Sequence, residues 1–241
     1  MTPIPIYVLA WHRPDMTERC LREIYERTRY PYEVHLWANG IQSKEEEQFY
    51  IRLSPFYDSI HLDKRNTCVW YPKGVQHMMT PADTPYYVLN DNDYYPPKLE
   101  SKCWLERMVD IMEATPTLGC LAAQVPPQIL QTPGTVYDQY VECKAVGNSL
   151  RLTRREAWPQ AEFRQELGKF GDDSILCEMM RQRGYHTGFA RAVYCLHHQP
   201  ENWGYEPEQL AQDPRKAGYK PPYEYQYNYE TYVPTNPDLR L

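Results

Sequence analysis

The sequence predicts an α/β protein built on one mostly parallel, doubly wound sheet of the Rossmann type, with helices on both faces. Three observations indicate this fold class. Short apolar runs alternate with helical patterns over residues 4–91, which is typical of βαβ units. A polar loop follows each apolar run, at the edge where ligands bind in such sheets. The 241 residues are 42% hydrophobic, which suffices for one large domain and excludes a disordered chain.

The first half of the chain carries the clearest periodicity. Runs rich in β-branched and aromatic residues predict strands at 4–10, 32–40, 58–63 and 86–91. Apolar residues spaced three and four apart predict helices at 15–30, 43–53 and 71–79. Asp15 or Thr17 can cap the first helix, and Ser43 with Glu46 three residues later can cap the second.

The second half is less regular and predicts a smaller, mixed region. Helices are expected at 98–114 and 172–185, the latter ending at Gly184. Strands are expected at 118–125 and 187–199, with two or three more within 135–153.

After residue 200 the composition shifts to tyrosine, proline and charge. Tyrosines alternate with polar residues over 223–229, a strand-like period bracketed by prolines. We expect this extension, residues 201–241, to wrap the domain as an edge strand, to form a homo-oligomer contact or to be partly mobile.

Charge and cysteine usage limit the functional classes. The formal charge is −6 and no long basic run occurs, so a large nucleic-acid footprint is not expected. The seven cysteines form no CxxC pair and are expected to be reduced thiols in a cytoplasmic protein. The first residues lack the basic start of a signal peptide. No apolar stretch approaches the roughly 20 residues of a transmembrane helix.

The stretch "YVLNDNDYYPP" ends a predicted strand in two carboxylates, Asp91 and Asp93. One intervening residue puts both on the same side of an extended chain. Two such carboxylates repel each other unless a cation lies between them, and hard oxygen ligands suit Mg²⁺ or Mn²⁺. A solvated loop with asparagine and aspartate caps is the alternative interpretation.

Two further groups are candidates for chemistry. Asp172 and Asp173 open a predicted helix, where the dipole favours an ionised carboxylate that could serve as a general base. An ordinary pair of helix-capping aspartates is the alternative. His197 and His198 end a predicted strand, so alternation points one of them inward, where it could be a metal ligand. A surface histidine pair is the alternative there.

The order of these segments from Ile4 to His198 resembles that of the GT-A nucleotide-sugar glycosyltransferases, most closely the inverting family 2 type. The matching segments are "IPIYVLAWHRPDMTERCLREI", "ANG", "YYVLNDND", "VGNSLRLTRREAW" and "GDDSILCEMMRQRGY", followed by a histidine. The resemblance implies a single GT-A domain over residues 1–200. Its donor half would lie near 1–95 and its acceptor half near 96–200.

The resemblance also implies roles for individual residues. Asp93 would bind the metal, and Asp91 would contact ribose, a metal-bound water or the metal itself. Asp173 would be the catalytic base with Asp172 as its acidic neighbour. His197 would be the C-terminal metal ligand, with His198 in reserve. The residues expected to hold the nucleotide-sugar donor are Ala10, Trp11, His12, Arg13, Asn39, Arg65, Asn66, Lys73, Asp91 and Asn92.

The implied reaction moves a sugar from a nucleotide-diphosphate donor, with UDP favoured, to an acceptor hydroxyl, with Mn²⁺ or Mg²⁺ and with inversion. Asn39 stands where the family often has aspartate. The identity of the nucleobase in the donor is therefore left undecided by the resemblance. The acceptor could be a glycan, a protein, a metabolite or a hydroxymethylated DNA base. A sugar-nucleotide nucleotidyltransferase and a non-catalytic binding module are the alternatives. The first usually has a glycine-rich, basic opening loop, which "AWHRPDMTERC" lacks.

Overall fold

The computed structural model describes residues 2–11, 13–64, 84–125, 133–158 and 172–197, apart from the side chains of residues 133 and 172–175. The helix predicted at 71–79 and the extension at 201–241 lie outside these ranges.

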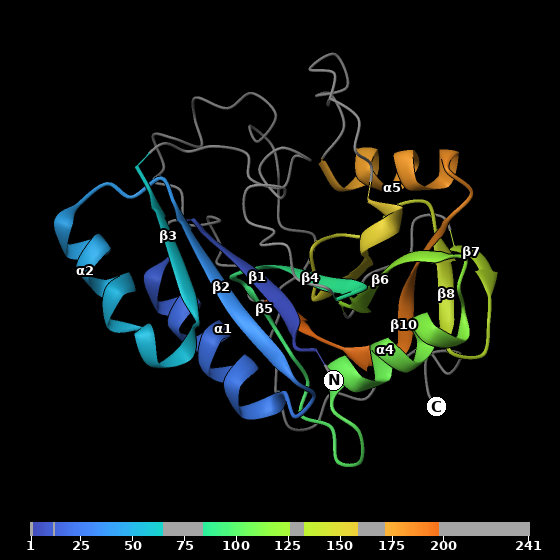
Figure 1. Cartoon of the computed structure of the whole chain (residues 1–241), viewed down its shortest axis with the longest axis horizontal. Helices are drawn as coiled ribbons and strands as arrows, with labels where there is room; N and C mark the ends of the chain where they lie inside the picture. Colours follow the sequence, from blue (N-terminus) through green and yellow to red (C-terminus); the bar gives the residue numbers. More distant parts are fainter. Residues whose placement is uncertain (1, 12, 65–83, 126–132, 159–171, 198–241) are drawn as a thin grey trace, which may run out of the picture.

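A nine-stranded sheet runs through the centre of the protein (Figure 1). Its strands are β1 (Ile4–Trp11), β2 (Tyr32–Asn39), β3 (Ser59–Asp63), β4 (Tyr86–Asp91), β6 (Leu118–Gln124), β7 (Pro133–Val136), β8 (Tyr140–Cys143), β9 (Arg151–Arg154) and β10 (His186–Tyr194). They are ordered β3-β2-β1-β4-β9-β6-β10-β8-β7. The first four neighbours are parallel, as are β6 and β10. Strand β9 runs antiparallel between β4 and β6. The predicted α/β class, with a mostly parallel sheet and a mixed second half, is confirmed.

Helices cover both faces of this sheet, as predicted. Helices α1 (Pro14–Arg27), α2 (Lys44–Arg52) and α4 (Trp104–Ala114) lie on one face, and α5 (Asp172–Gln182) lies on the other (Figure 1). Two short 3₁₀ turns, η1 (Ser54–Phe56) and η2 (Arg155–Ala157), complete the described helical segments. None of the helices in the described ranges is long and apolar enough to cross a membrane.

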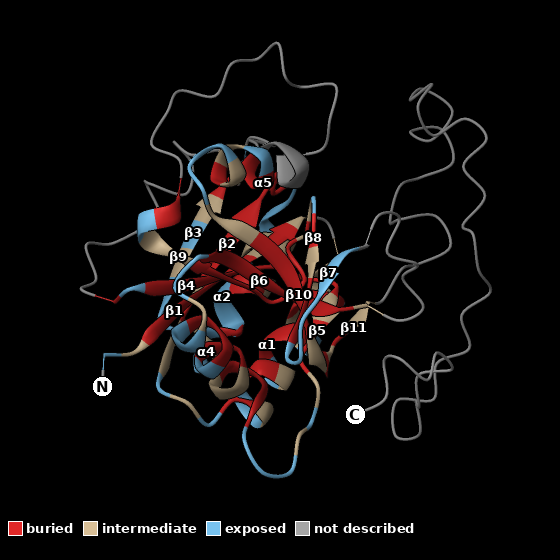
Figure 2. Cartoon of the chain, turned by 90° about the vertical axis from the view of Figure 1, so that its right-hand side faces the viewer, coloured by how far each residue is buried: buried red, intermediate tan, exposed pale blue. Residues whose placement is uncertain are grey.

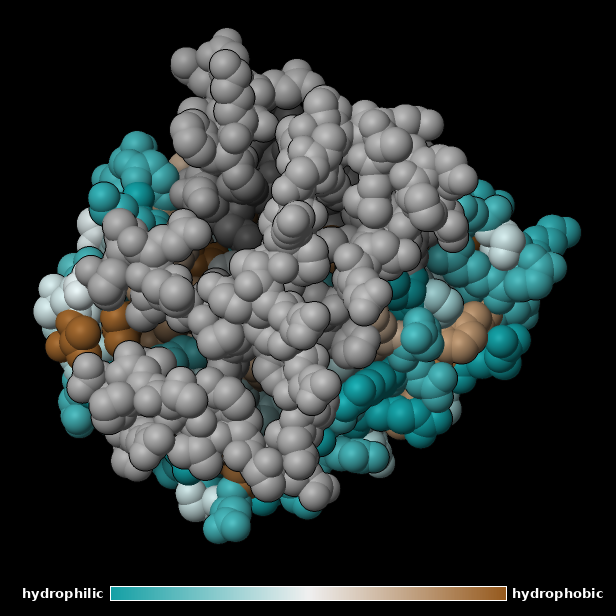
Figure 3. Space-filling view, turned by 180° about the vertical axis from the view of Figure 1, so that it is seen from behind, coloured by the Kyte–Doolittle hydropathy of each residue, from teal (hydrophilic) through white to brown (hydrophobic). Residues whose placement is uncertain are grey.

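The two faces of the sheet bury separate hydrophobic clusters. On the first face, apolar residues of α1, α2 and α4 pack on β1, β2 and β4. On the second, Leu176, Cys177 and Met180 of α5 pack near Tyr87 and Trp158. The central strands are buried while outer helix faces are exposed (Figure 2). Seen from behind, the described residues at the surface are mainly hydrophilic (Figure 3). The six described cysteines are all buried and free, as expected for reduced thiols.

Helix ends follow the sequence signals in part. Ser43 caps α2 by accepting a hydrogen bond from the Glu46 amide at 3.1 Å, and the Glu46 carboxylate accepts one from the Gln42 amide at 2.9 Å. This confirms the predicted capping pair. Gly184, at φ 87°, ends the last helix as predicted. Neither Asp15 nor Thr17 caps α1, however. That helix begins at Pro14, whose fixed φ suits the first helical position, and the cap position falls to Arg13.

One of the two helices predicted in the second half begins later than its pattern indicated. Helix α4 begins at Trp104 and not near residue 98. The Arg29 guanidinium accounts for the difference, because it donates hydrogen bonds to the backbone carbonyls of Leu99, Glu100 and Ser101 at 2.9–3.3 Å. Helix α5 begins at Asp172, as predicted, so Asp172 and Asp173 lie within its first turn.

A small second sheet joins the middle of the chain to its later part. Strand β5 (Tyr94–Tyr95) pairs antiparallel with β11 (Leu196–His197). The fully buried Asn90 amide secures this region. Asn90 donates to the Tyr94 carbonyl at 3.1 Å and accepts from the Leu150 amide at 2.9 Å. Leu150 has φ 51°, an uncommon backbone conformation for a branched residue, so this hydrogen bond holds an otherwise unfavourable turn.

Replacing Asn90 with leucine should therefore destabilise the protein strongly. The substitution leaves the buried Leu150 amide and Tyr94 carbonyl without this partner, for a loss of about 2–5 kcal/mol in the free energy of unfolding. Urea denaturation measures it. Gln48→Leu on an exposed position of α2 is the matched control and should change stability by under about 1 kcal/mol. An Asn90→Leu protein as stable as this control would contradict the assigned role.

Candidate functional site

Polar residues meet at the carboxyl ends of the parallel strands. Trp11, Asn39 and Asp63 end β1, β2 and β3 and lie opposite one another in register. Asn39 and Asp63 are buried, and Gly40 turns the chain away with φ 72°. Ala10, one residue earlier on β1, is fully buried. This row forms one wall of the edge where ligands bind in open α/β sheets.

The Asp93 carboxylate lies beside this row, in the turn after β4. It is only 4% exposed. Its Oδ2 atom lies 3.0 Å from the Arg13 guanidinium and 3.5 Å from Nε2 of His197. Its Oδ1 atom is buried and has no hydrogen-bond partner among the described residues. Burial alone would raise the pKa of the Asp93 carboxyl. The hydrogen bond and charge of His197 and the charge of Arg13 outweigh it, so the pKa lies below its ordinary value.

In the alternating sequence "NDND", the asparagines and the aspartates have different structural roles. Asn90 holds the Leu150 turn, and the buried Asn92 amide donates to the Thr17 hydroxyl at 2.8 Å. The Asn92 backbone amide donates to the Leu9 carbonyl at 3.0 Å. The asparagines thus anchor the turn to β1, α1 and the loop before β9, and this anchoring places Asp93 at the edge. The expected contact of Asn92 with a donor stays a prediction.

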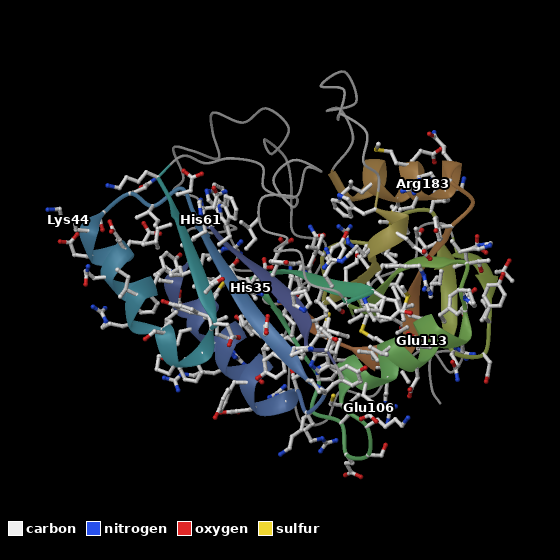
Figure 4. The ribbon with its side chains drawn as sticks, in the orientation of Figure 1. His35, Lys44, His61, Glu106, Glu113 and Arg183 are labelled. Carbon is white, nitrogen blue, oxygen red and sulfur yellow. The ribbon has the colours of Figure 1, made fainter. Side chains whose placement is uncertain are left out.

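His197 reaches Asp93 because the small sheet aligns it. His197 pairs with Tyr94 across β5 and β11, and their rings stack with centroids 4.2 Å apart and planes 18° apart. The other described histidines are engaged elsewhere. His35 stacks on Tyr7, His61 lies against Trp37, and His186 Nδ1 lies 3.0 Å from the Glu142 carboxylate. Figure 4 shows His35 and His61 on the first strands of the sheet, with Glu106 and Glu113 along α4.

Arg13 approaches Asp93 from an unusual backbone conformation, at φ 127° and ψ 63°. Such values are rare for a residue with a side chain and are maintained only when the surroundings impose them. Here the Arg13 carbonyl is fixed by the Thr17 amide at 3.1 Å and by the Thr17 hydroxyl at 3.2 Å. The Asn92 amide also approaches this carbonyl, at 3.5 Å.

The residues present fit a divalent metal in part. An unpartnered carboxylate oxygen on Asp93 and an imidazole nitrogen on His197 are suitable ligands. The described ranges contain no group of three or more His, Cys, Asp or Glu side chains that could hold an ion. Asp91, half-buried at the end of β4, is therefore not gathered with Asp93 and His197 into such a group.

The remaining predicted site residues lie outside the described structure. These are His12, Arg65, Asn66, Lys73 and His198, together with the side chains of Asp172 and Asp173. Their assigned roles stay predictions.

Sequence reasoning missed two buried amides near the acidic turn. The backbone carbonyl of Asn148 accepts a hydrogen bond from the backbone amide of Asp91 at 3.2 Å. The backbone carbonyl of Gln124 accepts one from the backbone amide of Cys195 at 2.8 Å. The side-chain Oδ1 of Asn148 and Nε2 of Gln124 are buried without partners in the described part of the chain. The available signal was a polar residue ending each of two apolar or glycine-containing segments, "CLAAQ" and "VGN".

Solved structures share this fold. A mannosyltransferase, PcManGT from Pyrobaculum calidifontis in complex with GDP-Man and Mn²⁺, matches with a TM-score of 0.62 and 18% identity, over 87% of this chain and 60% of that one. GalNAc-T7 with UDP, GalNAc and Mn²⁺ matches with 0.59 and 13%, over 81% and 44%. TarS of S. aureus matches with 0.55 and 12%, over 83% and 38%.

These similarities confirm the predicted GT-A fold. The chain spans between 38% and 60% of the length of these three structures. No family model matches it, and no curated protein does so either.

The Thr17 hydroxyl should be a measurable support of this site. Thr17→Val keeps the shape but removes a buried hydroxyl bonded to the Arg13 carbonyl and the Asn92 amide, so we expect a loss of about 1–3 kcal/mol in the free energy of unfolding. Thr153→Val is the matched control, because the Thr153 hydroxyl is equally buried but bonds to no described residue. It should be neutral or stabilising. Equal losses in chemical denaturation would show that the hydrogen bonds of Thr17 are not responsible.

Proposed function

We propose that this protein is a metal-dependent glycosyltransferase that moves a sugar from a nucleotide-diphosphate donor to an acceptor hydroxyl. The observation that carries the proposal is the Asp93 carboxylate, buried at the carboxyl edge of a GT-A sheet with one oxygen unpartnered and His197 beside the other. Two of the similar structures hold Mn²⁺ with GDP-Man or with UDP, which supports the same classes of metal and donor here.

Asp93 Oδ1 and His197 Nε2 would hold the ion, Mn²⁺ or Mg²⁺, with His198 in reserve. Asp91 would contact ribose or a metal-bound water. The bound ion supplies one thing, the stabilisation of negative charge on the departing diphosphate. The protein contributes a buried carboxylate whose lowered pKa keeps it ionised and ready to bind a cation.

The row formed by Trp11, Asn39 and Asp63 would bind the nucleoside part of the donor. Its members are aligned by strand register at the ends of three adjacent strands. The Asn39 amide offers both a donor and an acceptor, so it suits more than one base edge. We retain UDP-sugars as the favoured donors and GDP-sugars as the comparison. Arg65, Asn66 and Lys73 would complete the donor site.

Asp173 would remove the proton from the acceptor hydroxyl as that oxygen attacks the anomeric carbon. Its position in the first turn of α5 favours the ionised form a base needs. A single displacement with one base inverts the sugar configuration. The donor half would be residues 1–95 and the acceptor half 96–200. The proposed acceptors are a glycan, a protein, a metabolite or a hydroxymethylated DNA base, reached in the cytoplasm.

Thermal unfolding tests the metal site. We expect UDP with Mn²⁺ to raise the melting temperature more than the sum of the shifts from UDP alone and Mn²⁺ alone, because binding to the folded state stabilises it. Asp93→Asn should lose the metal-dependent part of the shift. Asp110→Asn, exposed on α4 and paired with Lys102, should keep it. Equal shifts with and without Mn²⁺ would refute a metal-bridged donor, and GDP in place of UDP tests the base.

Asp173→Asn separates binding from chemistry. Removing a general base should lower kcat by about 10²–10⁴-fold while leaving donor affinity unchanged. Donor hydrolysis and transfer are followed by mass spectrometry, and UDP affinity by calorimetry. Asp172→Asn, the neighbouring substitution, should be far milder. A dead Asp172→Asn with an active Asp173→Asn would move the base by one position. Nucleotide binding by the wild type without any turnover would indicate a binding module.

A further inference from the structure

Arg13 occupies a position that a simple structural ion pair does not require. It stands at the N-terminal cap of α1, where the helix dipole disfavours a positive charge. Its backbone conformation, at φ 127°, is one that residues with side chains rarely adopt. Both features are unfavourable, and both are held in place by the hydrogen bonds that fix the Arg13 carbonyl. The result is that the Arg13 guanidinium lies beside the buried Asp93 carboxylate.

The contact is also one-sided. Arg13 Nη1 lies 3.0 Å from Oδ2 of Asp93, whereas the Oδ1 atom of the same carboxylate has no hydrogen-bond partner in the described ranges. A structural arginine–carboxylate pair commonly engages both oxygens. The guanidinium thus neutralises the buried charge and leaves open an oxygen suited to a cation.

Two cations at one buried carboxylate repel each other. Arg13 is 14% and Asp93 6% exposed at the side chain, so water screens little of that repulsion. A divalent ion placed at Asp93 and His197 would therefore meet the positive charge of Arg13 at close range. The ion can bind well only if the guanidinium turns away or finds a second anion.

We propose that Arg13 is an internal cation that competes with the divalent metal for Asp93 and gives way when a nucleotide diphosphate provides it with another anion. In the free protein Arg13 stabilises the buried carboxylate, so metal binds weakly on its own. When the diphosphate is present, the guanidinium can pair with its oxygens, and the carboxylate passes to the metal. Metal and nucleotide then bind as a coupled pair. This inference rests on the metal site of the proposed function.

The experiment measures Mn²⁺ affinity by the electron paramagnetic resonance signal of free Mn²⁺, with and without UDP, in a parallel series with GDP. In the wild type, nucleotide should tighten Mn²⁺ binding by at least about tenfold, within the usual range of coupling between two sites. Arg13→Gln removes the charge but keeps a hydrogen-bond donor for Asp93. Without nucleotide, this variant should bind Mn²⁺ about tenfold more tightly than the wild type. Nucleotide should then tighten its Mn²⁺ binding by a smaller factor than in the wild type.

Two further variants separate charge from structure. Arg13→Lys keeps the positive charge and should retain most of the wild-type coupling. Arg22→Gln, an exposed arginine on the same helix that pairs with Glu18, should leave Mn²⁺ affinity unchanged in both states. Arg13→Gln and Arg13→Lys behaving alike would overturn the proposal, because the charge would then be irrelevant.

A structure of the wild type gives a readout that does not depend on variant folding. With Mn²⁺ and UDP bound, the Arg13 guanidinium should no longer contact Asp93. If it still does, or if Arg13→Gln binds Mn²⁺ without nucleotide no better than the wild type, the competition is refuted while the proposed function stands. If the wild type binds no Mn²⁺ with either nucleotide, the metal site of the proposed function fails, and this inference fails with it.

Discussion

Burial of the Asp93 carboxylate is the constraint on which the surrounding structure depends. A charge at 4% exposure must be neutralised and held in one place. Arg13 supplies a positive charge and His197 an imidazole nitrogen, and each is placed there by its own structural element. For Arg13 it is a fixed, strained helix cap, and for His197 it is a two-stranded sheet that joins residues about a hundred positions apart in the chain. Much of the local structure at this edge therefore serves to provide the Asp93 carboxylate with partners.

Much of the fold could be predicted from the sequence because its signals are periodic and local. The strands at 4–10 and 86–91, the Ser43 capping pair and the Gly184 stop depend on neighbouring residues alone, and the structure confirms them. The pairing order could not be predicted in this way. Strand β9 lies between β4 and β6, and this placement depends on contacts between distant segments that no short pattern records.

The candidate site could be predicted in outline for a related reason. The order of motifs along the chain placed Asp93 and His197 in one site, and the structure brings them within 3.5 Å. Sequence could not distinguish the buried, bridging asparagines from the aspartates beside them, because both residue types favour the same turns. Nor could it reveal the Arg13–Asp93 contact, the late start of α4 or the amides of Gln124 and Asn148. Each of these depends on side-chain geometry fixed only after the strands assemble.

The reversed strand β9 also has a consequence for how this scaffold can change. Parallel strands present the loops that follow them to the edge, whereas β9 presents the loop that precedes it, so that Asn148 meets Asp91. The edge is thus lined by loops that follow some strands and precede another. Insertions or deletions within residues 144–148 would reshape this edge without shifting the register of β1, β2 and β4. The edge can therefore change its shape at this loop while the row of Trp11, Asn39 and Asp63 keeps its alignment.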